Sequence, residues 1–242
     1  MSEIMTIASS TWQRILRMKS VYFLILCVLI LIASAYNYSV LSLDCHRELM
    51  VDVALLLNTI AAVITAISIS FEIPKELREG VASTLLSKPL GRTQYLVGKL
   101  VGMIVAGLVI TGLITIGYLF VFNSFFNDVN VAMFQAQLLV MASVIPMCAI
   151  ALLISVLIPE NLAPLFTAVA IWFSFSVTKL SNLQYVYGGI LPDLNLYNIR
   201  AEASYGVPVA WSYFSLVILW GLVFAVFSTS IASMIFGQKD LK

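Results

Sequence analysis

The chain has 242 residues, of which 61% are hydrophobic and 10% are charged, and its formal net charge is +1. Soluble proteins carry about 25% charged residues, so this chain has too few charges to cover the outside of a water-soluble domain of its length. The composition therefore indicates an integral membrane protein, and no nucleic acid partner is expected. Its three cysteines, Cys27, Cys45 and Cys148, are widely spaced and predict neither a disulfide framework nor a metal site.

The N-terminal residues 2–19 have the spacing of an amphipathic helix. Apolar residues recur at Ile4, Ala8, Trp12, Ile15 and Met18, beside a basic group that consists of Arg14, Arg17 and Lys19. This pattern predicts a helix lying on the membrane surface. The alternative is a plain basic flank that only fixes the topology of the chain.

Six apolar segments meet the length of about 20 residues that a bilayer-spanning helix needs, if the fifth is allowed to be short. They cover approximately residues 21–43, 50–73, 95–122, 131–158, 162–178 and 210–236. Because backbone polar groups in lipid need internal partners, we expect an all-α fold in one transmembrane domain, residues 1–242. The first segment resembles a signal peptide ending at Ala33-Ser34-Ala35, but its apolar run continues to Leu43, so we expect an uncleaved helix.

The distribution of lysine and arginine predicts the orientation, because these residues are retained on the cytoplasmic side. Only Arg47, Lys179 and Arg200 fall on the other side. Both termini and the segment 71–99 are then expected in the cytoplasm. The residues on the cytoplasmic side are Arg14, Arg17, Lys19, Lys75, Arg78, Lys88, Arg92, Lys99, Lys239 and Lys242.

The segment from Phe71 to Lys99 is a charged stretch between the second and third spans. Between Pro74 and Pro89 it has the pattern of a short amphipathic helix. Leu77, Val81, Thr84, Leu85 and Lys88 share one face, whereas Glu76, Glu79, Ser83 and Ser87 lie on the others. This spacing alone leaves two interpretations open: an interfacial helix that connects two spans, or a docking element for a cytoplasmic partner.

The same segment carries a recognisable pattern. Glu79-Gly80, Ser83 to Leu90 (STLLSKPL), Arg92, Tyr95 and Gly98-Lys99 resemble the first cytoplasmic loop of type 2 ATP-binding-cassette (ABC) permeases, with mild departures at Val81, Ala82 and Gly91. Leu191-Pro192-Asp193-Leu194 is similar to an outer loop of that family. Phe236 to Leu241 is similar to its cytoplasmic ending.

This resemblance implies a permease subunit that forms the translocation pathway of an exporter in a bacterial or archaeal cytoplasmic membrane. It implies two separate ABC ATPase subunits, which bind ATP and Mg, and a second copy of the chain or a paralogous permease. The chain itself would then be no enzyme and bind no cofactor. Gly98-Lys99-Leu100 is only similar to the end of a P-loop, since Leu100 lacks the required hydroxyl. The residues expected to couple to the ATPase are Lys75, Glu76, Arg78, Glu79, Gly80, Ser83, Thr84, Leu85, Lys88, Pro89 and Arg92.

Two other classes remain open. A non-transporting scaffold would use the same helix to recruit an ATPase or an assembly factor. An intramembrane enzyme would need ionisable residues near the middle of a span, and the sequence places none there. Asp52 and Lys99 lie near the ends of spans, where their charged groups are expected to reach water.

The remaining polar and small residues carry weaker expectations. Asn58, Gln135, Gln137 and Asn182 predict contacts between helices rather than a substrate route. Gly98, Gly102 and Ala106 repeat every fourth residue and predict close helix packing. The turn at Glu160 and Asn161 is expected to be a solvated hairpin, with a second ATPase contact as the alternative. Residues 179–209 are expected to cap the outer end or to fold back into the membrane.

Overall fold

The computed structural model describes residues 3–38, 45–80, 91–126, 129–176 and 192–238. These residues form helices joined by short turns, and no strand occurs among them, which confirms the all-α prediction. The elements are α1 (Glu3–Leu16), α2 (Lys19–Tyr38), α3 (His46–Ile69), α4 (Glu72–Arg78), α6 (Arg92–Phe126), α7 (Val131–Leu157), α8 (Ala163–Ser176), η3 (Leu194–Tyr197), α10 (Arg200–Ser204) and α11 (Trp211–Gly237).

Four helical stretches are long and apolar enough to cross a membrane: α3 together with α4, α6, α7 and α11. A fifth is added if α1 and α2, which meet at a bend of 59°, count as one broken span. α8 has 14 residues, and at 1.5 Å per residue it extends about 21 Å, less than the roughly 30 Å of a hydrocarbon core. Among the described residues, the structure therefore supports a membrane protein with four to five spans.

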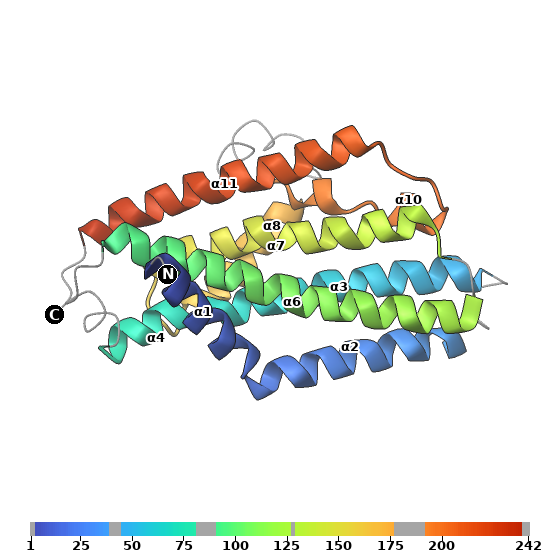
Figure 1. Ribbon diagram of the computed structural model, residues 1–242, viewed down its shortest axis with the longest axis horizontal. Coiled ribbons are helices and arrows are strands. Elements are labelled where there is room, and N and C mark those ends of the chain that lie inside the picture. The colour runs from blue at the N-terminus through green and yellow to red at the C-terminus, as the bar shows by residue number, and fades with distance from the viewer. Residues whose placement is uncertain (1–2, 39–44, 81–90, 127–128, 177–191, 239–242) are drawn as a thin grey trace.

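α7 lies at the centre of the bundle. It packs against α3, α6, α8 and α11, and these helices run roughly along the long axis of the molecule (Figure 1). Its buried residues are spread around the whole helix, as expected of an apolar helix without a polar face. α1 instead crosses α6 obliquely at the end of the bundle where α4 lies.

α4 corrects the helix predicted from Pro74 to Pro89. It begins at Glu72, directly after α3, and its last helical residue is Arg78. Gly80 then adopts φ +72°, a left-handed conformation that glycine tolerates because it has no Cβ. The described part of the predicted helix is therefore a short extension of the second span that stops before Gly80, and residues 81–90 lie outside the described residues.

The packing of α1 on α6 confirms the close approach predicted for Gly98 and Gly102. A Cβ on Gly98 would lie 2.9 Å from the Ile7 Cβ, and one on Gly102 would lie 2.8 Å from the Ala8 carbonyl oxygen. The helix predicted at the N-terminus is present, and Ala8 and Ile15 of its predicted apolar set are buried. Ile7 and Thr11 are buried as well, whereas Ile4, Trp12 and Met18 are only partly buried. Gly98 and Gly102, which we call the glycine strip of α6, have no side chains, so this face of α1 packs directly against the α6 backbone. The position of α1 on a membrane surface stays a prediction.

Polar side chains inside the bundle join helices, as predicted. Asn58 of α3 donates from Nδ2 to Gln137 Oε1 of α7 at 2.6 Å and to Thr115 Oγ1 of α6 at 3.1 Å. The Gln135 side chain donates from Nε2 to the Val209 carbonyl and accepts from the Val209 backbone N–H at Oε1, each at 3.0 Å. Such bonds fix helices in an apolar medium. Asn182 lies outside the described residues.

The segment before α11 folds back onto the bundle. The Tyr197 hydroxyl donates to the Val217 carbonyl at 2.9 Å, and Asn195 Nδ2 donates to the Phe175 carbonyl at 2.6 Å. Asp193 accepts the backbone N–H of Asn195 and so caps η3. Residues 192–209 thus pack against α7, α8 and α11, at the end of the bundle opposite α4 (Figure 1).

The glycine strip predicts a difference between two substitutions in one helix. Gly102→Ala places its methyl group 2.7 Å from the Thr11 Cβ, whereas Gly112→Ala meets only the flexible end of Met141 at 3.4 Å. Overpacking costs about 1–3 kcal/mol, so Gly102→Ala should unfold at a temperature several degrees below the wild type in thermal melts of the detergent-solubilised protein. Gly112→Ala should match or exceed the wild type, and equal melting of both variants would contradict the packing.

Candidate functional site

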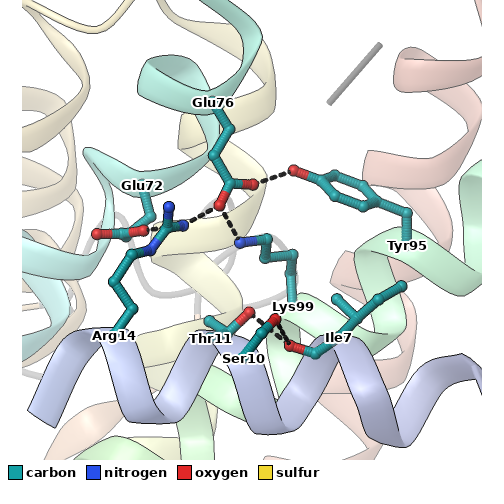
Figure 2. A network of polar contacts seen from close by, with 8 residues as sticks. All are labelled: Ile7, Ser10, Thr11, Arg14, Glu72, Glu76, Tyr95 and Lys99. Atoms are coloured by element: carbon teal, nitrogen blue, oxygen red, sulfur yellow. Dashed lines mark hydrogen bonds and ion pairs between the residues drawn. The ribbon is translucent and has the colours of Figure 1, made fainter. Parts of the chain in front are cut away.

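A buried cluster of charged side chains joins α1, α4 and α6 (Figure 2). At its centre, the carboxylate of Glu76 pairs with Arg14 and with Lys99, whose Nζ lies 2.5 Å from Glu76 Oε1. The Tyr95 hydroxyl donates to Glu76 Oε2 at 2.5 Å. Arg14 also pairs with Glu72. We call these five residues, Arg14, Glu72, Glu76, Tyr95 and Lys99, the Glu76 cluster.

The cluster is closed to solvent on the side of α4 and α6. Glu76 is 3% exposed, Glu72 4% and Lys99 2%, while the side chain of Arg14 keeps 41% exposure at the rim. Two carboxylates face two cations, so the formal charges cancel. Charges can be buried at tolerable cost only when they are paired and hydrogen-bonded, and each buried charge here has an opposite charge in contact. The cluster therefore holds three helices in one arrangement.

Local sequence explains how these side chains meet. Glu72 and Glu76 are four residues apart and share one face of α4, and Tyr95 and Lys99 do the same on α6. The Lys99 ammonium also lies 5.8 Å from the centroid of the Tyr95 ring, within range of a cation–π contact. Lys99 sits beside Gly98, so the close approach of α1 brings Arg14 to the same place.

A second ion pair ties α4 to the turn between α7 and α8. Arg78 Nη1 lies 2.9 Å from Glu160 Oε2, and the Glu160 side chain is 19% exposed. The hairpin predicted at Glu160 and Asn161 is present, and Asn161 is exposed. Glu160, however, is partly buried rather than merely solvated, because Arg78 of α4 pairs with it. A groove of about 350 Å³ runs between the two elements, lined by Pro74, Leu77, Arg78, Ser155, Ile158, Pro159, Glu160 and Asn161.

A third contact brings the end of α11 to this region. Arg92 Nη1 donates to the carbonyl oxygens of Phe236 at 3.0 Å and Gly237 at 2.8 Å. These carbonyls lie at the C-terminal end of a helix, where a cation is favourable. The rings of Tyr95 and Phe236 stack with centroids 5.9 Å apart. The beginning of α6 thus contacts α1, α4 and α11 at one end of the bundle.

The structure divides the predicted coupling residues into different roles. Lys75, Arg78 and Glu79 are exposed, as expected of a contact surface. Glu76 was predicted to couple to the ATPase from a face other than the apolar one, but it is buried, since it neutralises Lys99 and Arg14. Arg92 contacts α11, and Gly80 ends the turn after α4. The predicted residues Ser83, Thr84, Leu85, Lys88 and Pro89 lie outside the described residues.

Several residues of this region were not identified from the sequence as members of a buried cluster. Lys99 was expected to reach water, but it is buried against Glu76. Arg14, Glu72 and Tyr95 were not recognised as partners. The available signal was the pair of carboxylates at 72 and 76 beside a lysine inside an apolar helix, because a charge near the membrane requires a partner.

No protein-family model and no curated protein matches the chain. What the geometry offers is a short helix with one face fixed by buried ion pairs and the other exposed beside a groove. This is an arrangement suited to binding a macromolecule and passing a displacement to the bundle.

The cluster predicts a large stability difference between two neighbouring glutamates. Glu76→Gln leaves Lys99 and Arg14 short of one carboxylate, and breaking a buried ion pair costs about 3–5 kcal/mol. Glu79→Gln changes an exposed side chain and should stay within about 0.5 kcal/mol of the wild type. Chemical unfolding in mixed micelles measures the free energy of unfolding of both variants and of the wild type.

A second substitution separates electrostatics from packing. Adding Lys99→Met to Glu76→Gln removes the uncompensated ammonium, and replacing a buried pair by apolar groups is often neutral. The double variant should therefore recover much of the lost stability. A double variant less stable than Glu76→Gln alone would show that Lys99 is not paired with Glu76.

Proposed function

We propose that this chain is the membrane-spanning permease subunit of an ABC exporter, coupled to a separate cytoplasmic ATPase. The observation that carries the proposal is the two-sided character of α4. Glu72, Ile73, Pro74 and Glu76 are buried, whereas Lys75, Arg78 and Glu79 are exposed on the same seven-residue helix. The resemblance of the following loop to type 2 ABC permeases supports the same assignment.

A helix of seven residues is not stable alone in water, so the bundle must supply its stability. The Glu76 cluster and the Arg78–Glu160 pair do this from two sides. An ATPase that presses on the exposed face, or enters the groove beside Glu160, would displace α4 together with α1 and α6. Coupling of this kind needs a rigid attachment, which the buried ion pairs provide.

The proposal includes the assembly that the resemblance implies. Two permease subunits, either two copies of this chain or this chain with a paralogue, would form the pathway with two ATPase subunits. ATP and Mg would bind to the ATPase, and the described end that carries α4 would face the cytoplasm with both termini. A symmetric pair is the common way to complete such an assembly. The proposed setting is a bacterial or archaeal cytoplasmic membrane, in which the spans contact lipid.

The exposed face of α4 predicts which substitutions break the complex. The double variant Lys75→Glu/Glu79→Lys reverses two exposed charges without changing the net charge. It should lose the nucleotide-binding protein that co-purifies with the chain from native membranes in mild detergent, as identified by mass spectrometry. Glu202→Lys on α10, exposed at the opposite end, is the control and should retain it. If no nucleotide-binding protein co-purifies with the unmodified chain, the proposal fails.

A non-transporting scaffold would form the same complex, so a second measurement is needed. α6 and α11 border an apolar groove of about 520 Å³ that includes Val97 and Ser230. In a variant without native cysteines, Val97→Cys and Ser230→Cys should be cross-linked by a bifunctional maleimide at a rate that changes when the complex binds ATP. A scaffold predicts the same rate with and without ATP.

A further inference from the structure

A groove between α3 and α8 lies at the end of the bundle opposite the Glu76 cluster. It has a volume of about 450 Å³, within the range of small-molecule sites. The described helix α8 has 14 residues and α3 has 24. Its lining includes Leu56, Ile60 and Ile64 of α3 and, from the segment around η3 and α10, Asn195, Asn198 and Arg200.

The lining changes from polar to apolar along the groove. Asn195, Asn198 and Arg200 come from the segment around η3 and α10 and form one end, whereas aliphatic and aromatic side chains of α3 and α8 form the rest. Asn195 is fixed by its hydrogen bond to the Phe175 carbonyl, which joins the polar end to α8. A groove of this kind fits an amphiphile with a polar head and an apolar chain.

The polar end carries both signs of charge. Arg200 Nε lies 3.3 Å from Asp52 Oδ1, and the two side chains are 31% and 48% exposed. A guanidinium binds phosphate through its planar fork, and Arg200 meets Asp52 through Nε, at one edge of that fork. The Asp52 carboxylate can accept from an ammonium. Because the pair is neutral overall, it complements a head that carries one charge of each sign.

The length of the groove also fits a lipid. From Asp52 to Ile64 the α3 axis rises about 18 Å at 1.5 Å per residue, close to half of the roughly 30 Å hydrocarbon core. An amphiphile with its head at Arg200 and Asp52 would therefore reach the middle of the bilayer along Leu56, Ile60 and Ile64. A surface that merely faces lipid tails would need neither the ion pair nor the asparagines.

We propose that this groove binds one phospholipid with an amine-bearing headgroup, its phosphate on Arg200, its ammonium on Asp52 and one acyl chain along α3 and α8. The site does not depend on the proposed ATPase coupling, since none of its residues belongs to the Glu76 cluster or to α4. It holds equally for a transporter and for a scaffold.

Native mass spectrometry of the full-length chain tests the site. The protein is transferred from detergent into mixed micelles that contain equal amounts of dipalmitoyl phosphatidylethanolamine and dipalmitoyl phosphatidylglycerol. The wild type should retain one phosphatidylethanolamine in preference to phosphatidylglycerol by about tenfold, the factor expected for one charge-assisted hydrogen bond. Asp52→Asn removes the negative charge that attracts the ammonium and leaves a net positive site, so its preference should shift to phosphatidylglycerol.

Matched variants separate the groove from the general lipid surface. Ile60→Trp fills the groove and should abolish retention of either lipid, whereas Ile116→Trp, a lipid-facing position on α6 that is 66% exposed, should behave as the wild type. Inorganic phosphate should not displace the retained lipid. An unchanged preference in Asp52→Asn, wild-type retention in Ile60→Trp, or displacement by phosphate alone would each overturn the proposal, and none of these readouts requires an ATPase.

Discussion

The carboxylate of Glu76 is buried, so it needs oppositely charged and hydrogen-bonding partners from other helices. Arg14, Tyr95 and Lys99 provide these contacts from α1 and α6. Loss of Glu76 would remove the partner of Lys99, and loss of Arg14 would remove the partner of Glu72. Either change costs several kcal/mol, so the three helices cannot separate independently. The position of α4, and with it the Arg78–Glu160 contact and its groove, depends on this pairing.

Close packing makes the pairing possible. Gly98 and Gly102 let the backbone of α1 approach α6 more closely than any larger residue would, and Arg14 lies one turn beyond Thr11 on the same helix. The glycines therefore favour the ion pairs indirectly, because they allow α1 to bring Arg14 close to Glu72 and Glu76. Attached in this way, α4 would move with α1 and α6 rather than independently of them.

The sequence predicted the features that depend on local pattern. Composition and spacing predict the all-α class and the apolar spans. They also predict the packing at Gly98 and Gly102 and the hydrogen bonds of Asn58 and Gln137. The burial of Glu76 could not be predicted in this way, because its partners Arg14 and Lys99 lie 62 and 23 residues away along the chain. Helical periodicity assigns a glutamate to a polar face and does not show contacts at such distances. The end of α4 was not predicted, because the amphipathic pattern continues from Pro74 to Pro89 and does not show that Gly80 adopts a left-handed conformation.

α1 and α4 form one rigid unit through the Glu76 cluster. Spin labels at Gln13→Cys and Lys75→Cys, both exposed positions, in a chain without native cysteines test this by double electron–electron resonance in lipid nanodiscs. We expect a single narrow distribution of distances between the two labels, which broadens when Glu76→Gln is added. A distribution that is already broad with Glu76 present, or one that Glu76→Gln leaves unchanged, would contradict it.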